Sequence, residues 1–341
     1  MRIRLATDAD AARWNAFVNL CPRANFYQRF EWAGVNHDRL GHQTHFLIAE
    51  RGDTVTGILP LVRVRSMLFG DVLASMPFVN FGGPAGMDDA TEAGLVDAAC
   101  AHAARLRCHY LQLRASRAFG DLQVTTDKVS MTIALDRDPE AVMRGFTAKH
   151  RHNIRRAQKN DIMVRAGGAE LLADFFETLS LSWQRLGTPL YRHTYFEDIV
   201  RRFGDDVRIY VAYRGGVPIA TAFNGYFRDT VEGLWAGVDP QAHDLQPNYV
   251  LYWEMIRDAC ERGFRYFQLG RSTKDSGAMR FKEKWSAQPQ QLYWNYHLVR
   301  AKEIPQLNPD NPRYEHAIRL WQRLPLRVLR VIGPPLARLI P

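Results

Sequence analysis

The 341-residue sequence predicts a mixed α/β fold (α+β) in which one structural unit occurs twice, followed by a helical tail. Segments 45–64 and 208–227 each read as a strand, a tight turn and a second strand. The turns are Gly52-Asp53 and Gly215-Gly216, which suit two-residue hairpins. Each hairpin is therefore expected to open a mostly antiparallel mixed sheet flanked by helices.

The elements that follow the two hairpins also correspond. An amphipathic helical segment, DAACAHAARLR (97–107) or YVLYWEMIRDACERG (249–263), precedes a hydrophobic strand in each half. Those strands contain the words YLQL (110–113) and YFQL (266–269), which are nearly the same. One α/β unit thus occurs twice. Chance similarity of two α/β stretches is the alternative.

The repeat divides the chain into two domains and a tail. We place the first domain at 1–140, with a helix near 8–20, and the second at 141–300. Arg137-Asp138-Pro139 marks the break between them. The tail, 301–341, opens with prolines that stop regular structure.

Several classes of protein are excluded by composition. No run of about 18 apolar residues exists, so no transmembrane helix is expected. The N-terminus lacks the apolar region of a signal peptide, which predicts a cytoplasmic protein. The four cysteines form no CxxC pair and the histidines no HExxH motif, so neither a metal nor a permanently bound cofactor is predicted.

Positive charge is concentrated in two segments. The net charge is +9, and segment 144–165 contains seven basic residues against one acidic residue. The tail contains seven basic and three acidic residues. Two anion-facing surfaces are expected from this distribution. A solvated basic face without a partner is the alternative.

The basic stretch FTAKHRHNIRRAQKND (146–161) predicts a helix whose main buried residue is Ile154. Its cations cannot all be buried, and their density suits phosphate groups. Candidates for binding phosphate or the acceptor are Lys149, Arg151, Asn153, Arg155 and Arg156.

A second helix is predicted to begin at Pro247 and Asn248, which are favourable residues at a helix start, and to end at Gly263. A helix N-terminus placed between two strands offers free N–H groups and a positive dipole to an anion. An ordinary packed helix is the alternative.

Three segments occur in an order that resembles a known family: HRHNIRRAQK (150–159), PNYVLYWEMIRDACERGFRYFQLGRS (247–272) and SGAMRFKEKW (276–285). They are similar to Fem-type peptidoglycan-bridge aminoacyltransferases and their acyltransferase relatives. More narrowly, they resemble the FemAB-related proteins of the exosortase/PEP-CTERM exopolysaccharide systems. The resemblance extends from about residue 20 to the end.

The resemblance implies two tandem GNAT-like domains that face one cleft, with the donor site in the second domain. The donor would be aminoacyl-tRNA or acyl-CoA. Where GNAT enzymes have a glycine-rich pyrophosphate loop, this sequence has Gln246, Pro247 and Asn248. That departure weighs against tight coenzyme A binding.

Site residues follow from the same resemblance. RFKEKW matches a Fem pattern of aromatic, lysine and aromatic residues, in which Phe281 and Trp285 anchor a short helix. Lys282 would then face the phosphate of the donor or the developing oxyanion, and a solvated surface lysine is the alternative. The implied catalytic residues are Lys282, Arg271 and Ser272, and the implied donor-binding residues are Asn248, Tyr249, Tyr252, Ser276 and Arg280.

The predicted function is direct transfer of an aminoacyl or acyl group to an amine or hydroxyl of a cell-envelope precursor, a peptidoglycan peptide or an exopolysaccharide. No Ser-His-Asp or Cys-His arrangement indicates a covalent enzyme intermediate. Asp239, Glu254 and Glu232 remain open as general bases. The alternative is a catalytically silent envelope-assembly or RNA-binding module with the same fold.

The tail is basic and amphipathic. Ile318, Trp321 and Leu324 form one helical stripe, and arginines interleave with it. This pattern favours peripheral binding to an anionic membrane, here the inner membrane, and docking on its own domain is the alternative. Pro325, Pro334 and Pro335 are expected to prevent one long helix.

Overall fold

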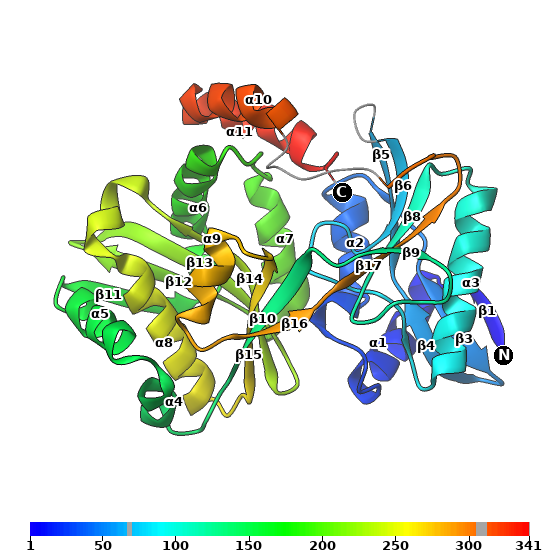
Figure 1. Ribbon diagram of the computed structural model, residues 1–341, viewed down its shortest axis with the longest axis horizontal. Helices are drawn as coiled ribbons and strands as arrows, with labels where there is room; N and C mark the ends of the chain where they lie inside the picture. The colour runs from blue at the N-terminus through cyan, green and yellow to red at the C-terminus, as the bar shows by residue number, and fades with distance from the viewer. Residues whose placement is uncertain (67–69, 305–311, 341) are drawn as a thin grey trace. The chain divides into compact units, whose positions relative to one another are not determined.

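The computed structural model describes residues 1–66, 70–304 and 312–340 (Figure 1). These residues form two compact units. The first contains Met1–Val129 and the segments that begin at Gln290 and at Arg338, and the second contains Ser130–Pro289 and the described residues of 307–337. The predicted mixed α/β fold is confirmed, since each unit has β-sheet flanked by helices.

The contacts change unit near Ser130 and Gln290, whereas the sequence placed domain boundaries at 140 and 300. Strand β10 (Lys128–Ala134) lies in the sheet of the second unit, and β17 (Tyr293–Leu298) pairs with β8 (Tyr110–Ala115) in the first. The boundaries differ because these strands pair with partners far away in the sequence, which local patterns do not reveal. The predicted cleft between the domains stays a prediction.

Among its described residues the first unit contains two sheets. The strand order in the four-stranded sheet is β1 (Arg2–Leu5), β3 (Leu47–Arg51), β4 (Thr54–Leu59) and β7 (Ala85–Gly86). In the six-stranded sheet it is β2 (Gln43–Thr44), β5 (Leu61–Ser66), β6 (Gly70–Ser75), β8, β17 and β9 (Gln123–Thr125). Pro60 separates β4 from β5, and because proline has no N–H to continue a ladder, the chain passes from one sheet to the other there.

The helices of the first unit are α1 (Ala11–Leu20), α2 (Glu31–Asp38) and α3 (Asp89–Arg105) in the described part of the chain. Short 3₁₀ turns in the two units are η1 (Asp8–Asp10), η2 (Phe26–Gln28), η3 (Ala169–Leu171), η4 (Gly204–Asp206) and η5 (Pro240–Leu245). The start of α1 confirms the helix predicted near 8–20.

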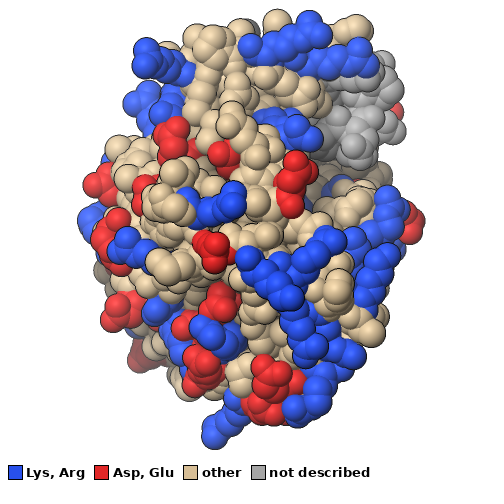
Figure 2. Space-filling model, turned by 90° about the vertical axis from the view of Figure 1, so that its left-hand side faces the viewer, with Lys and Arg blue, Asp and Glu red and all other residues tan. Residues whose placement is uncertain are grey.

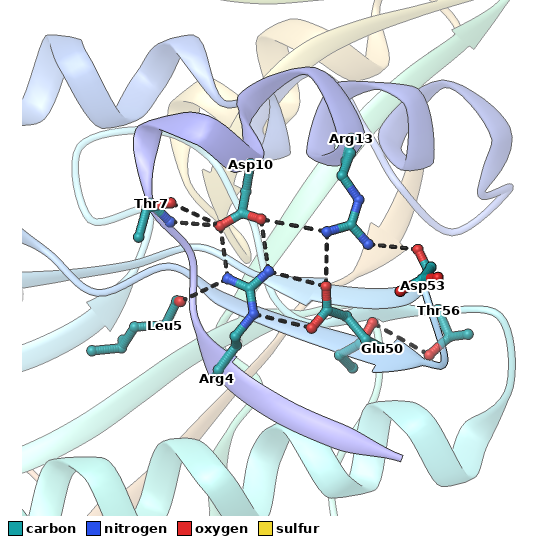
Figure 3. Close-up of polar contacts among 9 residues, drawn as sticks. Arg4, Leu5, Thr7, Asp10, Arg13, Glu50, Asp53 and Thr56 are labelled. Carbon is teal, nitrogen blue, oxygen red and sulfur yellow. Dashed lines mark hydrogen bonds and ion pairs between the residues drawn. The ribbon is translucent and has the colours of Figure 1, made fainter.

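An ion-pair network joins β1, α1 and β3 (Figure 3). The guanidinium of Arg4 donates to both carboxylate oxygens of Asp10 at 2.7 Å and to those of Glu50 at 3.0 Å. Arg13 also binds Glu50, at 2.9 Å. The carboxylates of Asp10 and Glu50 are almost buried. The hydrogen bonds that Asp10 accepts from Arg4 hold the pKa of Asp10 well below its usual range. The network fixes the N-terminal strand and therefore has a structural role.

The second unit is built on one seven-stranded sheet of described residues. Its order is β11 (Ile162–Gly167), β12 (Val207–Arg214), β13 (Val217–Phe227), β14 (Thr230–Val238), β15 (Tyr266–Thr273), β10 and β16 (Gln288–Gln291). Its helices are α4 (Pro139–Gly145), α5 (Ala148–Gln158), α6 (Leu172–Leu186), α7 (His193–Phe203), α8 (Pro247–Glu261), α9 (Gly277–Glu283), α10 (Pro312–Arg323) and α11 (Leu326–Ala337).

Helices cover both faces of this sheet (Figure 1). On β13 the ring of Phe223 packs on Phe175 of α6, whereas the next residue, Asn224, donates to the sulfur of Met255 on α8. Neighbouring residues of a strand point to opposite faces, so α6 and α8 lie on opposite sides of the sheet. Helix α7 covers the α6 side, and α5 packs against α8.

The predicted repeat is present in the topology. The hairpins β3–β4 and β12–β13 close at Arg51–Thr54 and Arg214–Val217, with the predicted glycine turns between. Strands β6 and β8 are parallel neighbours connected through α3, and β14 and β15 are parallel neighbours connected through α8. Both units thus contain an antiparallel hairpin and a strand–helix–strand crossover. The two features share one sheet in the second unit, whereas in the first unit they lie in two different sheets.

The tail helices α10 and α11 pack on α6. Trp321 and Leu329 form a buried cluster with Leu190, and Leu324 packs against it, as the predicted stripe requires. Pro325 separates the helices as predicted, but Pro334 and Pro335 lie inside α11, so the expected break there is wrong. Close packing of Gly333 on the Leu190 backbone holds this end helical. Most of the proline segment 304–312 lies outside the described residues.

Candidate functional site

Strands β14 and β15 separate at the middle of the sheet. Their parallel ladder begins at Thr230–Tyr266 and ends at Glu232–Gln268, although β14 continues to Val238 and β15 to Thr273. Backbone N–H and C=O groups beyond the last pair are released from the ladder, which is the usual place for a ligand in an α/β sheet.

Helix α8 begins after β14, through η5. Its first residue is Pro247, as predicted, and the preceding Gln246 has a left-handed backbone with φ of 55°. Gln246 N–H donates to His243 and Tyr249 N–H donates to Gln246, at 3.0 and 3.1 Å. Since proline has no N–H, Asn248 supplies the remaining backbone donor in this first turn. A side chain at left-handed φ costs about 1–2 kcal/mol, so this turn is strained.

The basic helix α5 lies beside this turn. Arg156 donates to the side chain of Gln246 at 2.8 Å, and Asn160 donates to the carbonyl of Leu245 at 2.9 Å. Asn153 donates to the hydroxyl of Tyr249 at 3.3 Å. Three hydrogen bonds thus place α5 against the N-terminus of α8.

The cations of α5 divide into two sets. Lys149, Arg155 and Arg156 are exposed, and Ile154 is fully buried as predicted. Arg151 instead donates to the carbonyls of Arg144 and Phe146 at the end of α4, which is a structural role. The face of the molecule on which α5 lies shows Lys and Arg side chains grouped in a band (Figure 2).

A cluster of aromatic rings connects α5, α8 and α9. Trp285 is fully buried, with ring centroids 4.4 Å from His150 and 5.5 Å from Tyr252. Phe146 and Phe281 also contact it, at 5.6 and 6.5 Å. The predicted anchoring of α9 by its two aromatic residues is therefore confirmed. Tyr252 packs within this cluster.

His150 is buried in the same cluster as a neutral ring. Its two ring nitrogens have no hydrogen-bond partner among the described residues. Burial, with a smaller effect of the Lys284 charge, lowers the pKa of His150 to about 4.

Lys282 is buried, at 9% exposure, so the alternative of a solvated surface lysine is wrong. Its ammonium donates to the carbonyl oxygens of Gly270 and Arg271, both at 3.0 Å. Burial and the nearby Arg271 charge lower the pKa of Lys282 to about 7. These carbonyls lie on the part of β15 that has left the ladder with β14, so a titratable amine stands where the two strands separate.

The other predicted residues around α9 are placed differently. Ser272 is 4% exposed and its hydroxyl has no hydrogen-bond partner in the described part of the chain. Ser276 caps α9 by accepting from Met279 N–H at 3.2 Å, and exposed Arg280 donates to the carbonyl of Asp275 at 2.7 Å. The structure thus gives Ser276 a local capping role.

The three candidate bases lie apart in the structure. Glu232 is buried at the last β14–β15 pair. Asp239 follows β14 and caps η5 by accepting from Gln241 N–H at 2.9 Å. Glu254 is on α8, where burial raises its pKa and Arg257 forms an ion pair with it.

A cavity of about 650 Å³ lies on the α6 side of the second unit. Polar side chains from α6, η5 and α10 line it, among them Gln184, Arg185, Asp239, Gln241 and Gln322. It therefore adjoins the carboxyl end of β14, at a residue that the sequence proposed as a base.

Sequence reasoning missed three features of this site. It did not find the left-handed Gln246, the packing of His150 on Trp285, or the cavity. The spacing of His150 and Trp285 in the sequence carries no signal of their contact. The one available signal for Gln246 is that it precedes a proline, which disfavours the right-handed helical region.

Among the described residues no group of His, Cys, Asp and Glu is arranged to hold a metal ion. None of the helices in that part of the chain has the length and apolarity needed to cross a bilayer.

Comparison with known proteins gives relatives of the fold. Residues 144–283 match the acetyltransferase (GNAT) domain family. The chain is similar in structure to FemX, with a TM-score of 0.67, 16% identity and 88% of this chain and 98% of that chain covered. No curated protein sequence matches it.

Two further solved structures are similar. The C-terminal domain of a putative lysylphosphatidylglycerol synthetase from Agrobacterium fabrum has a TM-score of 0.59 and 11% identity, covering 84% of this chain and 91% of that one. A tandem GNAT protein from the clavulanic acid biosynthesis pathway has a TM-score of 0.54 and 12% identity, covering 89% and 99%. Part of the second unit thus matches the GNAT domain family, and the predicted tandem GNAT-like fold of the chain is confirmed.

Proposed function

We propose that this protein transfers an aminoacyl or acyl group from an activated donor to an amine or hydroxyl of a cell-envelope precursor. The observation that carries this proposal is the separation of β14 and β15 beside buried Lys282 and the N-terminus of α8. The basic face of α5 adjoins the same turn. A donor bearing phosphate groups would fit this combination of charge and backbone geometry.

Aminoacyl-tRNA is the donor that the site favours. A pyrophosphate needs several backbone N–H groups, but Pro247 has none and those of Gln246 and Tyr249 are already bonded. The exposed cations of α5 suit a longer polyanion, whose phosphates are spread along a chain. Acyl-CoA is the second candidate, because the GNAT family match includes α8 and β15.

In the proposed reaction the acceptor amine attacks the carbonyl carbon of the donor ester. A carbon–nitrogen bond forms, the bond to the ribose oxygen breaks, and the proton lost by the amine replaces the acyl group on that oxygen. The Lys282 ammonium, with two hydrogens on carbonyls, has a third to donate to the developing oxyanion. Ser272 would donate its hydroxyl hydrogen to the substrate.

The acceptor would enter from the α6 side, through the cavity beside Asp239. The Asp239 carboxylate would bind an amine of the precursor, and Arg185 would bind a carboxylate or phosphate of the precursor. The resemblance to proteins of exosortase/PEP-CTERM systems favours an exopolysaccharide, and the resemblance to Fem enzymes favours a peptidoglycan peptide.

The choice of donor is tested by binding. Charged tRNA, uncharged tRNA and acetyl-CoA are titrated against the protein and against a Gln246→Gly, Pro247→Gly variant that restores the missing N–H. We expect the native protein to bind charged tRNA more tightly than acetyl-CoA, and the variant to gain affinity for acetyl-CoA. Tight binding of acetyl-CoA by the native protein, without tRNA binding, would assign the donor to coenzyme A.

A further inference from the structure

Helix α11 has one face that packs and another that does not. Leu329, Gly333 and Ala337, spaced four residues apart, are buried. Leu329 shares a cluster with Trp321 and Leu190, and Gly333 lies against the Leu190 backbone. This face holds the helix on its own domain, which was one of the two alternatives for the tail.

The opposite face of α11 is apolar and exposed. Val328, Val331 and Ile332 are 40%, 72% and 38% exposed, and with exposed Pro335 they follow the i, i+3, i+4, i+7 spacing of one helical stripe. A second apolar stripe on a helix that is already packed does not serve the core. Large contiguous apolar surface on a soluble domain marks a place of interaction.

Positive charge accompanies this stripe. Arg323, at the end of α10, and Arg327, on the first turn of α11, are exposed. Residues 316–340 contain no acidic residue. Arg330 is different, because it forms an ion pair with Glu177 and lies over the ring of Phe176, so it belongs to the packing with α6.

We propose that the exposed face of α11, with Arg323 and Arg327 beside it, binds the surface of an anionic lipid bilayer. Aliphatic side chains would enter the boundary between headgroups and acyl chains, and the guanidinium groups would bind lipid phosphates. The helix lies in the plane of the surface, since it is too short and too polar to span a bilayer.

Charge and apolarity together favour a bilayer over a nucleic acid. Binding to RNA needs cations and, for single strands, aromatic rings on which bases stack. The stripe of α11 is aliphatic, so it contributes nothing to an RNA complex. A bilayer uses both components.

If the proposed function holds, membrane binding through α11 also indicates the class of acceptor. A transferase held at a membrane through α11 would meet acceptors that are themselves attached to lipid. Binding to vesicles is measured without any transfer reaction, so the failure of one proposal is distinguishable from the failure of the other.

The test is sedimentation of the full-length protein with vesicles of phosphatidylglycerol and phosphatidylethanolamine, compared with vesicles of phosphatidylcholine. We expect binding to the anionic vesicles only. Val331→Glu should weaken vesicle binding by roughly tenfold, because it removes an apolar side chain that enters the bilayer. The double variant Arg323→Glu, Arg327→Glu should weaken vesicle binding by about fivefold for each of the two arginines removed.

Matched controls change exposed residues elsewhere in the second unit. Met163→Glu changes a side chain that is 70% exposed on β11, and Arg214→Glu changes an exposed arginine on β12; both should bind like the native protein. Equal binding by native protein and Val331→Glu would overturn the proposal. Loss of tRNA binding in the arginine variant, with vesicle binding unchanged, would also overturn it and assign the surface to RNA.

Discussion

The ammonium of Lys282 and the carbonyl oxygen of Gly270 are joined by a hydrogen bond of 3.0 Å. A second bond of the same length reaches Arg271, so two successive carbonyls face one amine. In a regular strand successive carbonyls point to opposite edges of the sheet. The φ of 77° at Gly270, which glycine accepts without steric cost, interrupts that alternation. A glycine inside β15, two residues beyond the last pair with β14, thus creates the cradle for a buried lysine.

Burial of Lys282 predicts a pH-dependent stability. Its folded pKa is about 7 and its unfolded value is 10.5, so between these values the unfolded state binds the extra proton. The free energy of unfolding should therefore rise with pH from about 7 to 10.5, by up to about 1.4 kcal/mol per pH unit from this group. Urea denaturation of the native protein and Lys282→Met at several pH values measures the difference between their slopes. Parallel stability curves would show that the lysine is not desolvated.

Trp285 is expected to hold the site together. Trp285→Ala leaves a cavity among His150, Tyr252 and Phe281 and should lower the free energy of unfolding by about 3–5 kcal/mol. Trp285→Phe keeps part of the packing and should cost less. Met163→Ala, at an exposed position, should change stability by no more than about 0.5 kcal/mol. Equal stability of Trp285→Ala and the native protein, in urea denaturation, would contradict this packing.

Much of this arrangement follows from local sequence, and the remainder follows from long-range contacts. The hairpins, the start of α8 and the anchoring of α9 were predicted, because turn glycines, a helix-starting proline and an i, i+4 aromatic pair act within a few residues. The burial of Lys282 was open in the sequence, since the spacing fits an exposed lysine equally well.

The membership of β17 in the first unit could not be predicted. Its partner β8 is far away in the sequence, and a strand pattern does not specify the strand with which it pairs. The same limit hid the contact of His150 with Trp285. Helix α11 shows a different limit, since packing on Leu190 overrides the tendency of Pro334 and Pro335 to end a helix.

His150 predicts a loss of stability in acid. Its folded pKa is about 4, below the unfolded 6.5, so the unfolded state binds more protons as the pH falls between these values. This group should cost the native protein about 3 kcal/mol over that range. Because the ring nitrogens of His150 have no partner among the described residues, His150→Phe loses no hydrogen bond. The variant should therefore keep its stability between pH 6.5 and 4 as far as this group is concerned. Thermal unfolding at pH 7 and pH 4.5 compares the two proteins, and the prediction is wrong if the variant loses as much stability as the native chain.

The exposed cations of α5 predict salt-dependent binding of the donor. Lys149→Ala with Arg155→Ala should weaken the binding of tRNA and reduce the slope of log affinity against log salt by about one for each phosphate that the variant no longer neutralises. Arg214→Ala, on β12, is the matched control and should leave the slope unchanged. The measurement is a filter-binding series from low to high potassium chloride. A slope that is the same in all three proteins would remove α5 from the donor site.

Transfer itself tests the account most directly. The purified protein is incubated with aminoacyl-tRNA labelled in the amino acid, or in parallel with labelled acyl-CoA, and with a fraction of nucleotide-linked and lipid-linked envelope precursors, and the labelled precursor is measured. We predict product from the native protein and a loss of about 100-fold or more in Lys282→Met, with the variant still folded. Failure to form product from either aminoacyl-tRNA or acyl-CoA, or transfer by Lys282→Met at the native rate, would contradict the account.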